Sequence, residues 1–195
     1  MDKIREKILN CNKCKEFGLN YNTAKEQNFD NAYNKYKPDL IKLLWIIESP
    51  PYVKPGKTPR YFYRPGLIEY RDILIKQIMG VLKISISGTK VESLKKFQEL
   101  GHFLIDAAKC PVNGPNKEFK PQILNNCIDI LQMEIEQLDP ENIIIIKKGI
   151  FNHIYSNVKC SGLEDRVLNK VPLPFPVGWD REKFPNVVSP YIENI

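Results

Sequence analysis

The chain has 195 residues, of which 43% are hydrophobic and 27% are charged, and its formal net charge is +6. This length favours one domain over residues 1–195 and buries about 70% of the unfolded surface, so no disulfide or metal is needed merely to fold. No apolar run is long enough to span a membrane, and the start MDKIREKIL does not resemble a secretory signal. We therefore expect a cytoplasmic monomer without a membrane partner, in a compartment where stable disulfides are rare.

Hydrophobic periodicity predicts helices that alternate with strands. An amphipathic helix at residues 2–9 precedes a polar stretch up to Pro38, whose elements are hard to assign and part of which we expect to be loop. Three apolar runs are typical of strands buried on both faces, at residues 40–47, 102–108 and 143–146. Helices are predicted at residues 67–82, 91–100, 121–138 and 149–158. In the Pro-rich tail, NVVS (residues 186–189) is a candidate fourth strand.

This alternation predicts an α/β fold of three layers, with a central, mostly parallel four-stranded sheet between two layers of helices. Such sheets place ligands at the carboxyl ends of their strands. Glu48 directly follows the first apolar run, so it is a candidate functional residue at that edge. The plainer alternative is a surface glutamate that caps a loop.

The cysteines fall into two distant segments and one isolated position. Cys11 and Cys14 form a C-x2-C pair, Cys110 lies just beyond the second strand, and Cys127 lies in the following helix. Four thiolates suit zinc or an iron–sulfur cluster. Zinc sites of similar span usually offer two C-x2-C pairs, so the spacing favours a cluster over zinc. Alternatively, the later two cysteines are small buried hydrophobes, and Cys160 has no partner motif.

These cysteines and the strand ends between them resemble the iron–sulfur uracil-DNA glycosylases, the thermophile-type class often called family four. IESPP (residues 47–51) is similar to the family's Gly-Glu-x-Pro-Gly motif, although both glycines are replaced. DAAKC (residues 106–110) is similar to its Asn-x-x-x-Cys pattern, and a helix with the fourth cysteine follows. The resemblance covers nearly the whole chain. It implies a uracil-DNA glycosylase-like fold and a structural [4Fe–4S] cluster on Cys11, Cys14, Cys110 and Cys127, with zinc as the less expected occupant.

The function that the resemblance implies is hydrolysis of the N-glycosidic bond of a damaged or deaminated base, uracil or a related one, in base-excision repair. The DNA partner would be single- or double-stranded, with its target nucleotide flipped out of the stack. Glu48 matches the family's water-activating acid. Cleavage builds positive charge on the sugar, which a nearby carboxylate stabilises.

The segment PRYFYRP (residues 59–65) interleaves aromatic and basic residues, which suits stacking on bases and contact with phosphates. Phe62 best matches the family's base-stacking aromatic residue, and Tyr61 or Tyr63 could take the same part. The alternative is an aromatic loop that packs on the core. The remaining expected contacts are Pro50 beside the base, and Arg60, Arg64 and Lys57 on the nucleic acid.

Two positions depart from the family pattern. Asp106 replaces the base-reading Asn, and an ionised Asp accepts hydrogen bonds without donating any. Uracil recognition should therefore be poor unless Asp106 is protonated, and a base edge with donors would suit it better. Ser189, in SPY, stands where the family has a His-Pro-Ser motif. His102 and His153 are expected to be packing or surface residues instead.

The sequence therefore leaves three hypotheses. The first is an iron–sulfur DNA glycosylase in which Asp106 reads the base. The second is a catalytically inactive iron–sulfur protein that binds nucleic acid on the same scaffold. The third is a structural zinc protein unrelated to DNA.

Overall fold

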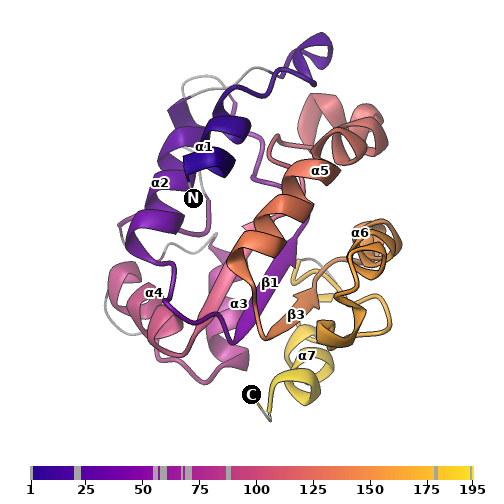
Figure 1. The fold of residues 1–195 in the computed structure, drawn as a ribbon. Coiled ribbons are helices and arrows are strands. Elements are labelled where there is room, and N and C mark those ends of the chain that lie inside the picture. Colours follow the sequence, from indigo (N-terminus) through magenta and orange to yellow (C-terminus); the bar gives the residue numbers. More distant parts are fainter. Residues whose placement is uncertain are drawn as a thin grey trace.

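The computed structural model describes residues 2–19, 23–54, 57, 61–66, 68, 72–86, 89–177, 180–193 and 195. Within these ranges the strands are β1 (Leu43–Ile47), β2 (His102–Asp106) and β3 (Asn142–Ile145). The α-helices are α1 (Asp2–Leu9), α2 (Thr23–Lys35), α3 (Ile73–Val81), α4 (Lys90–Glu99), α5 (Lys120–Leu138), α6 (Lys148–Cys160) and α7 (Phe184–Ile192). Short 3₁₀ helices are η1 (Lys15–Phe17), η2 (Gly114–Phe119) and η3 (Glu164–Arg166) (Figure 1).

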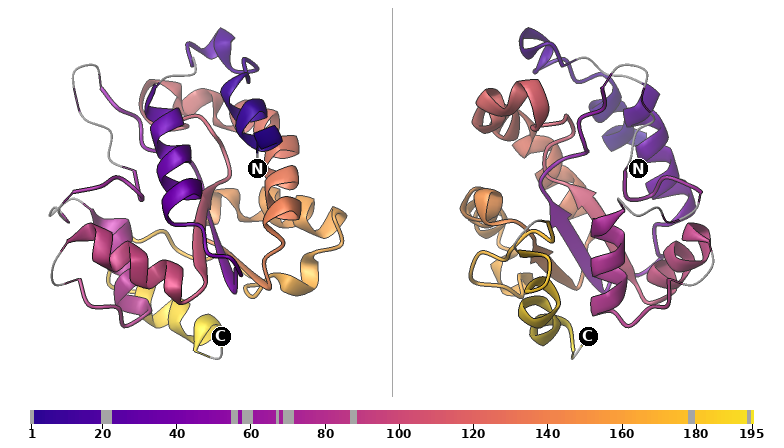
Figure 2. Two further views of the ribbon diagram at one scale, coloured as in Figure 1. Left: turned by 60° about the vertical axis from the view of Figure 1, so that its left-hand side comes forward. Right: turned by 180° about the vertical axis from the view of Figure 1, so that it is seen from behind.

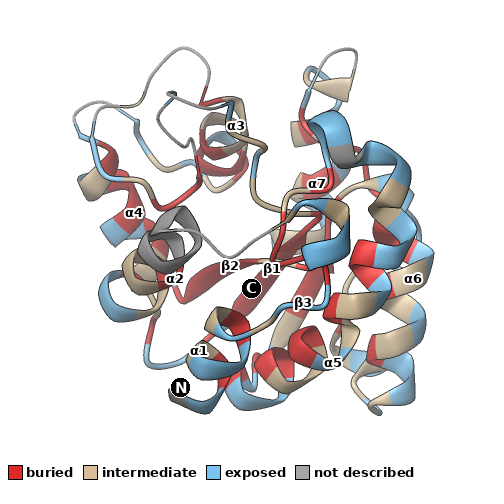
Figure 3. Cartoon of the chain, turned by 90° about the horizontal axis from the view of Figure 1, so that it is seen from above, coloured by how far each residue is buried: buried red, intermediate tan, exposed pale blue. Residues whose placement is uncertain are grey.

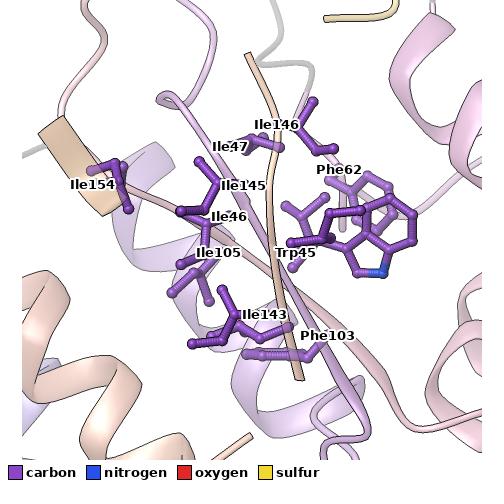
Figure 4. Packing of buried hydrophobic residues seen from close by; sticks show 14 of the residues in the cluster. Trp45, Ile46, Ile47, Phe62, Phe103, Ile105, Ile143, Ile145, Ile146 and Ile154 are labelled. Atoms are coloured by element: carbon purple, nitrogen blue, oxygen red, sulfur yellow. The ribbon is translucent and has the colours of Figure 1, made fainter. Parts of the chain in front are cut away.

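The three strands form one parallel sheet in the order β2-β1-β3. Ile46 of β1 stands opposite Ile105 of β2 and Ile145 of β3, so the three side chains form a row on one face of the sheet. Figure 4 shows this row among the buried hydrophobic side chains of the core. All five residues of β1 are buried, as the run LLWII predicts for a central strand. The expected α/β fold with a parallel sheet is confirmed.

Helices flank this sheet. Seen from above, α1 and α5 lie on one face, while α3 and α7 lie on the other (Figure 3). The contacts α1–α5 and α3–α7 agree with this arrangement, and α4 and α6 contact β2 and β3 respectively. The three views in Figures 1 and 2 show α1 lying along α5, which brings the Cys-bearing segment after α1 close to the helix that carries Cys127.

The expected fourth strand at residues 186–189 is wrong, because these residues lie inside α7. The pair Val187–Val188 suggests a strand, but Pro185 sits in the first turn of the helix, where its fixed φ is well placed. Phe184 and Val188 are one helical turn apart and both fully buried, while Val187 is exposed. The amphipathic face of a helix therefore decides the local structure.

Beside β3, single parallel bridges replace a fourth strand. Ile143 pairs with Val167, and Ile146 pairs with Leu173. Between these bridges, Asn169 accepts a hydrogen bond from the Ile145 N–H at 2.9 Å and donates to the Ile145 carbonyl at 3.1 Å. The side chain of one fully buried residue thus supplies the hydrogen bonds that a neighbouring strand would otherwise make.

The polar stretch after Cys14 contains a helix, α2, that the sequence analysis did not assign. Phe29, Ala32, Tyr33 and Tyr36 follow one another at helical spacing, and all four pack in the protein's apolar clusters. The predicted helix at residues 67–82 appears as α3 (Ile73–Val81), and residues 67 and 69–71 lie outside the described residues.

Candidate functional site

A cavity of about 440 Å³ lies at the carboxyl ends of β1 and β2, which is the edge at which parallel sheets place ligands. Its wall begins with the last residues of the two strands, Ile47 and Asp106. The aromatic residues of the wall are Phe29, Tyr33, Tyr52, Tyr61, Phe62, Tyr63 and Phe175. Its ionisable residues, apart from the tyrosines, are Asp72, Lys90, Asp106, Lys109 and Glu134.

Tyr61, Phe62 and Tyr63 are buried, and all three line the cavity. Tyr63 accepts a hydrogen bond from the Leu104 N–H of β2 at 2.7 Å, which fixes its ring on the sheet. The Phe62 ring packs edge-on against Tyr63, with 5.0 Å between the ring centroids. These side chains therefore pack on the core, as the alternative interpretation expects, and they also line the cavity; their contact with a base stays a prediction.

A buried ion pair also forms part of the cavity wall. Lys109 donates from Nζ to one carboxylate oxygen of Glu134 and to the backbone carbonyl of Asp106. Tyr33 donates its hydroxyl to the other oxygen of Glu134. Burial and the neighbouring Glu134 raise the pKa of Tyr33 well above its usual range, so Tyr33 keeps the proton that it donates. No sequence pattern indicated Tyr33 or Glu134, which lie 101 residues apart in the chain.

Asp106 is the last residue of β2 and stands opposite Ile47 in the sheet register. It lines the cavity, and its charge contributes to the raised pKa of both Tyr33 and Tyr63. A carboxylate therefore lies in the cavity wall at the position that the sequence predicts for base recognition.

Glu48, the other expected carboxylate, does not line this cavity. Its side chain is 4% exposed and forms ion pairs with Lys120 and Lys147. Lys147 donates a hydrogen bond to Oε2, while Oε1 meets Lys120 as an ion pair without hydrogen-bond geometry. Neither lysine was singled out in the sequence. The acid expected to activate water is therefore occupied by two cations.

Of the other residues expected to contact the nucleic acid, some line the cavity and others do not. Pro50 lines the cavity, whereas Ser189 lies on α7 and is not part of the wall. Lys57 is exposed and Arg64 is half-buried, while Arg60 lies outside the described residues. The C-terminal segment reaches the cavity through Phe175 of the run PLPFP.

Three of the four expected metal-ligating cysteines converge. Cys14, Cys110 and Cys127 are all buried, and the charges of the first two act on the Cys127 thiol. Burial raises the pKa of Cys127 to about 11, and the N–H of Lys109, 3.3 Å from its sulfur, opposes this shift. Cys11 is half-buried and packs against a separate apolar cluster that includes Ile130.

The C-x2-C loop is fastened to α5 beside Cys127. Asn126 donates to the Lys13 carbonyl at 3.1 Å and contacts the Cys14 sulfur at 3.6 Å. Lys13 forms an ion pair with Asp129 at 3.2 Å. These contacts hold the loop over the helix segment that carries the fourth cysteine.

Among the described side chains, no group of three or more His, Cys, Asp or Glu residues is placed to hold a metal ion. A single zinc ion needs its sulfur ligands about 2.3 Å from one centre, whereas an iron–sulfur cluster spaces its thiolates further apart with its own iron and sulfide ions. Soft thiolates suit either group.

Searches against protein-family models, curated proteins and solved structures found no match for this chain. In the part of the chain that the structure describes, no helix has the length and hydropathy needed to cross a membrane.

Proposed function

We propose that this protein is a uracil-DNA glycosylase-like enzyme that hydrolyses the N-glycosidic bond of a damaged or deaminated base in DNA. The observation that carries the proposal is the aromatic cavity at the carboxyl ends of β1 and β2. Its volume of about 440 Å³ is within the range of about 300–1,000 Å³ for small-molecule sites. A flipped nucleotide requires such a pocket, with rings to stack on and polar groups to bind the base edge.

In this proposal, Phe62 stacks on the base, and Tyr61 and Tyr63 flank it. Asp106 is the carboxylate of the cavity wall at the carboxyl end of β2, and in this proposal it binds the base edge and stabilises the positive charge that forms on the sugar. An ionised Asp106 favours a base that presents hydrogen-bond donors. This preference distinguishes the protein from an enzyme that recognises uracil through an asparagine.

The proposed cofactor is a [4Fe–4S] cluster held by Cys11, Cys14, Cys110 and Cys127, with zinc as the less favoured occupant. When bound, the cluster supplies a rigid cross-link and takes no part in bond cleavage. The cysteines of this chain would join the loop after α1 to the segment after β2, which carries Cys110, and to α5, which carries Cys127. Because Lys109 adjoins Cys110 and lines the cavity, this cross-link would steady the cavity wall.

The experiment is to incubate the metal-replete protein with oligonucleotides that carry uracil, hypoxanthine or xanthine, and to measure abasic sites by alkaline cleavage. We expect release of at least one base by the wild type and a loss of about 100-fold in Asp106→Ala, the usual size for a group acting in the transition state. Asp39→Ala, at an exposed position, is the matched control. Undiminished base release by Asp106→Ala would contradict the role of Asp106.

A second candidate is a catalytically inactive iron–sulfur protein that binds nucleic acid. The occupation of Glu48 by two lysines favours it, because this acid is not available to activate water. It predicts salt-sensitive oligonucleotide binding with no base released from any of the three lesions.

A further inference from the structure

Three charged side chains from separate segments meet beside the cavity. Glu48 follows β1, Lys120 begins α5, and Lys147 stands between β3 and α6. Each oxygen of the Glu48 carboxylate forms an ion pair with one of the lysines. The side chains of Lys120 and Lys147 are 27% and 28% exposed, against 4% for Glu48. The two lysine side chains are therefore partly open to solvent, while the carboxylate that they pair with is covered.

The charges within this group do not balance, because two ammonium groups share one carboxylate. A structural ion pair needs one lysine, and each additional charge taken from water costs desolvation energy. The α5 and α6 helices, of 19 and 13 residues, both begin here, and helix amino ends carry partial positive charge. Lys120 lies against α6, since a Cβ added at Gly149 would come within 3.2 Å of the Lys120 Nζ.

Lys147 also adjoins the cavity. Lys147 Nζ lies 5.3 Å from the ring centroid of Phe175, and Phe175 lines the cavity. Ser49, the residue after Glu48, lines it too. An anion bound by the lysines would therefore lie next to whatever occupies the aromatic cavity.

We infer that Lys120 and Lys147 form a phosphate-binding site, in which Glu48 is the carboxylate that phosphate displaces from the two ammonium groups. A nucleotide carries an aromatic base and a phosphate side by side, which matches the cavity and the adjoining lysines. The inference rests on the proposed function only in taking the phosphate group from a DNA strand. A free nucleotide is the other possible source of that phosphate group.

The test measures binding apart from catalysis. A labelled, undamaged single-stranded oligonucleotide is titrated with the holoprotein, and fluorescence anisotropy is recorded over a range of salt concentrations. We expect Lys120→Gln and Lys147→Gln each to weaken binding about tenfold. Each should also lower the slope of log affinity against log salt by about 0.7, the contribution of one phosphate contact to a single strand.

Lys96→Gln is the matched control, because Lys96 is an exposed lysine on α4 whose side chain is 57% exposed. Glu48→Gln gives the opposite expectation. Since phosphate competes with the carboxylate for the lysines, this variant should bind the oligonucleotide at least as tightly as the wild type. Circular dichroism melting identifies any variant that is not folded, and such a variant is replaced by Lys→Met at the same position.

Competition distinguishes the sources. Inorganic phosphate should displace the oligonucleotide from the wild type but not from the double variant Lys120→Gln with Lys147→Gln. This result supports the phosphate site whether or not any base is released. Direct binding of deoxynucleoside monophosphates without oligonucleotide binding identifies free nucleotides as the source. The inference is overturned if folded Lys120→Gln and Lys147→Gln bind like Lys96→Gln, or if folded Glu48→Gln loses binding.

Discussion

At the scale of single residues, Lys109 joins the two parts of the candidate site. Its N–H donates to the sulfur of Cys127, and its ammonium group pairs with Glu134, two turns further along α5. The sequence places Lys109 beside Cys110 and so near any metal centre. It contains no sign of the partner carboxylate, because the pairing of residues 25 positions apart depends on how α5 docks on the sheet.

The Lys109–Glu134 pair provides a stability test. Lys109→Met leaves the carboxylate of Glu134, which is 2% exposed, without its cation. We expect a loss of about 3–5 kcal/mol in the free energy of unfolding measured in urea. Replacing both residues, as Lys109→Met with Glu134→Leu, should recover much of it. Lys96→Met is the control, since its pair with Glu99 is exposed and worth at most about 1 kcal/mol. Equal losses in Lys109→Met and Lys96→Met would contradict the account.

His102 predicts a dependence of stability on pH. The expectation that it is a packing residue is confirmed, because it is buried against Phe97 and accepts from the Trp45 indole. Burial, and secondarily Lys42, lowers its pKa to about 4. Between this value and the unfolded value near 6.5, the unfolded chain binds a proton that the folded chain does not.

The contribution of His102 to the free energy of unfolding should therefore be fully present above about pH 6.5. It should fall by up to about 3 kcal/mol as the pH drops towards 4. Urea midpoints at pH 7, 5.5 and 4.5 measure this loss for the wild type and for His102→Gln. The difference between the two proteins isolates His102 from the carboxylates, which titrate in the same acidic range. Identical pH profiles would show that His102 does not carry the effect.

At the scale of elements, apolar runs located all three strands. LLWII and IIII are short, continuously apolar runs, and such runs are typical of strands that are buried on both faces of a parallel sheet. Helix α2 was missed because its many Asn and Lys residues obscure the spacing of Phe29, Ala32, Tyr33 and Tyr36. The α7 segment was misassigned because two adjacent valines suggest a strand, whereas Pro185 and the burial of Phe184 with Val188 fit a helix.

The contact that replaces a fourth strand can be tested at Asn169. Asn169→Ala leaves the buried N–H and carbonyl of Ile145 without their partners. We expect a loss of about 2–4 kcal/mol in the free energy of unfolding, since each unsatisfied buried group costs about 1–3 kcal/mol. Faster hydrogen exchange at the Ile145 amide should accompany it. Asn152→Ala, at an exposed position of α6, is the control. A loss no larger than in this control would contradict the role of Asn169 in satisfying the backbone of Ile145.

At the scale of the whole molecule, the carboxyl edge of the sheet carries the aromatic cavity, Asp106, and the Glu48–lysine group. The sequence predicted this edge, because parallel strands end together and place ligands there. It also predicted Phe62, Asp106 and Pro50 as residues of one site. It could not predict that Glu48 would face two lysines instead of the cavity, since that depends on where α5 and α6 begin.

The cysteine site predicts a coloured, iron-containing protein. Purified without oxygen, the wild type should be brown and contain iron, and Cys14→Ser, Cys110→Ser and Cys127→Ser should each lose both properties. Cys160→Ser should keep them, because Cys160 is exposed at the end of α6. Metal analysis and visible absorption provide the readout. A colourless protein that contains zinc would contradict the proposed iron–sulfur cluster and would show that the cysteines bind zinc instead.

The central claim is that one nucleotide occupies the carboxyl edge, with its base in the cavity and its phosphate on the lysines. A crystal structure with a single-stranded oligonucleotide containing 2′-fluoro-2′-deoxyinosine tests it most directly, because its hypoxanthine base presents an N1–H donor to Asp106 and the fluorine destabilises the sugar cation and preserves the glycosidic bond. The account predicts the base stacked on Phe62 beside Asp106, with an adjacent phosphate on Lys120 and Lys147. A complex in which the strand binds another surface and the cavity stays empty would contradict it.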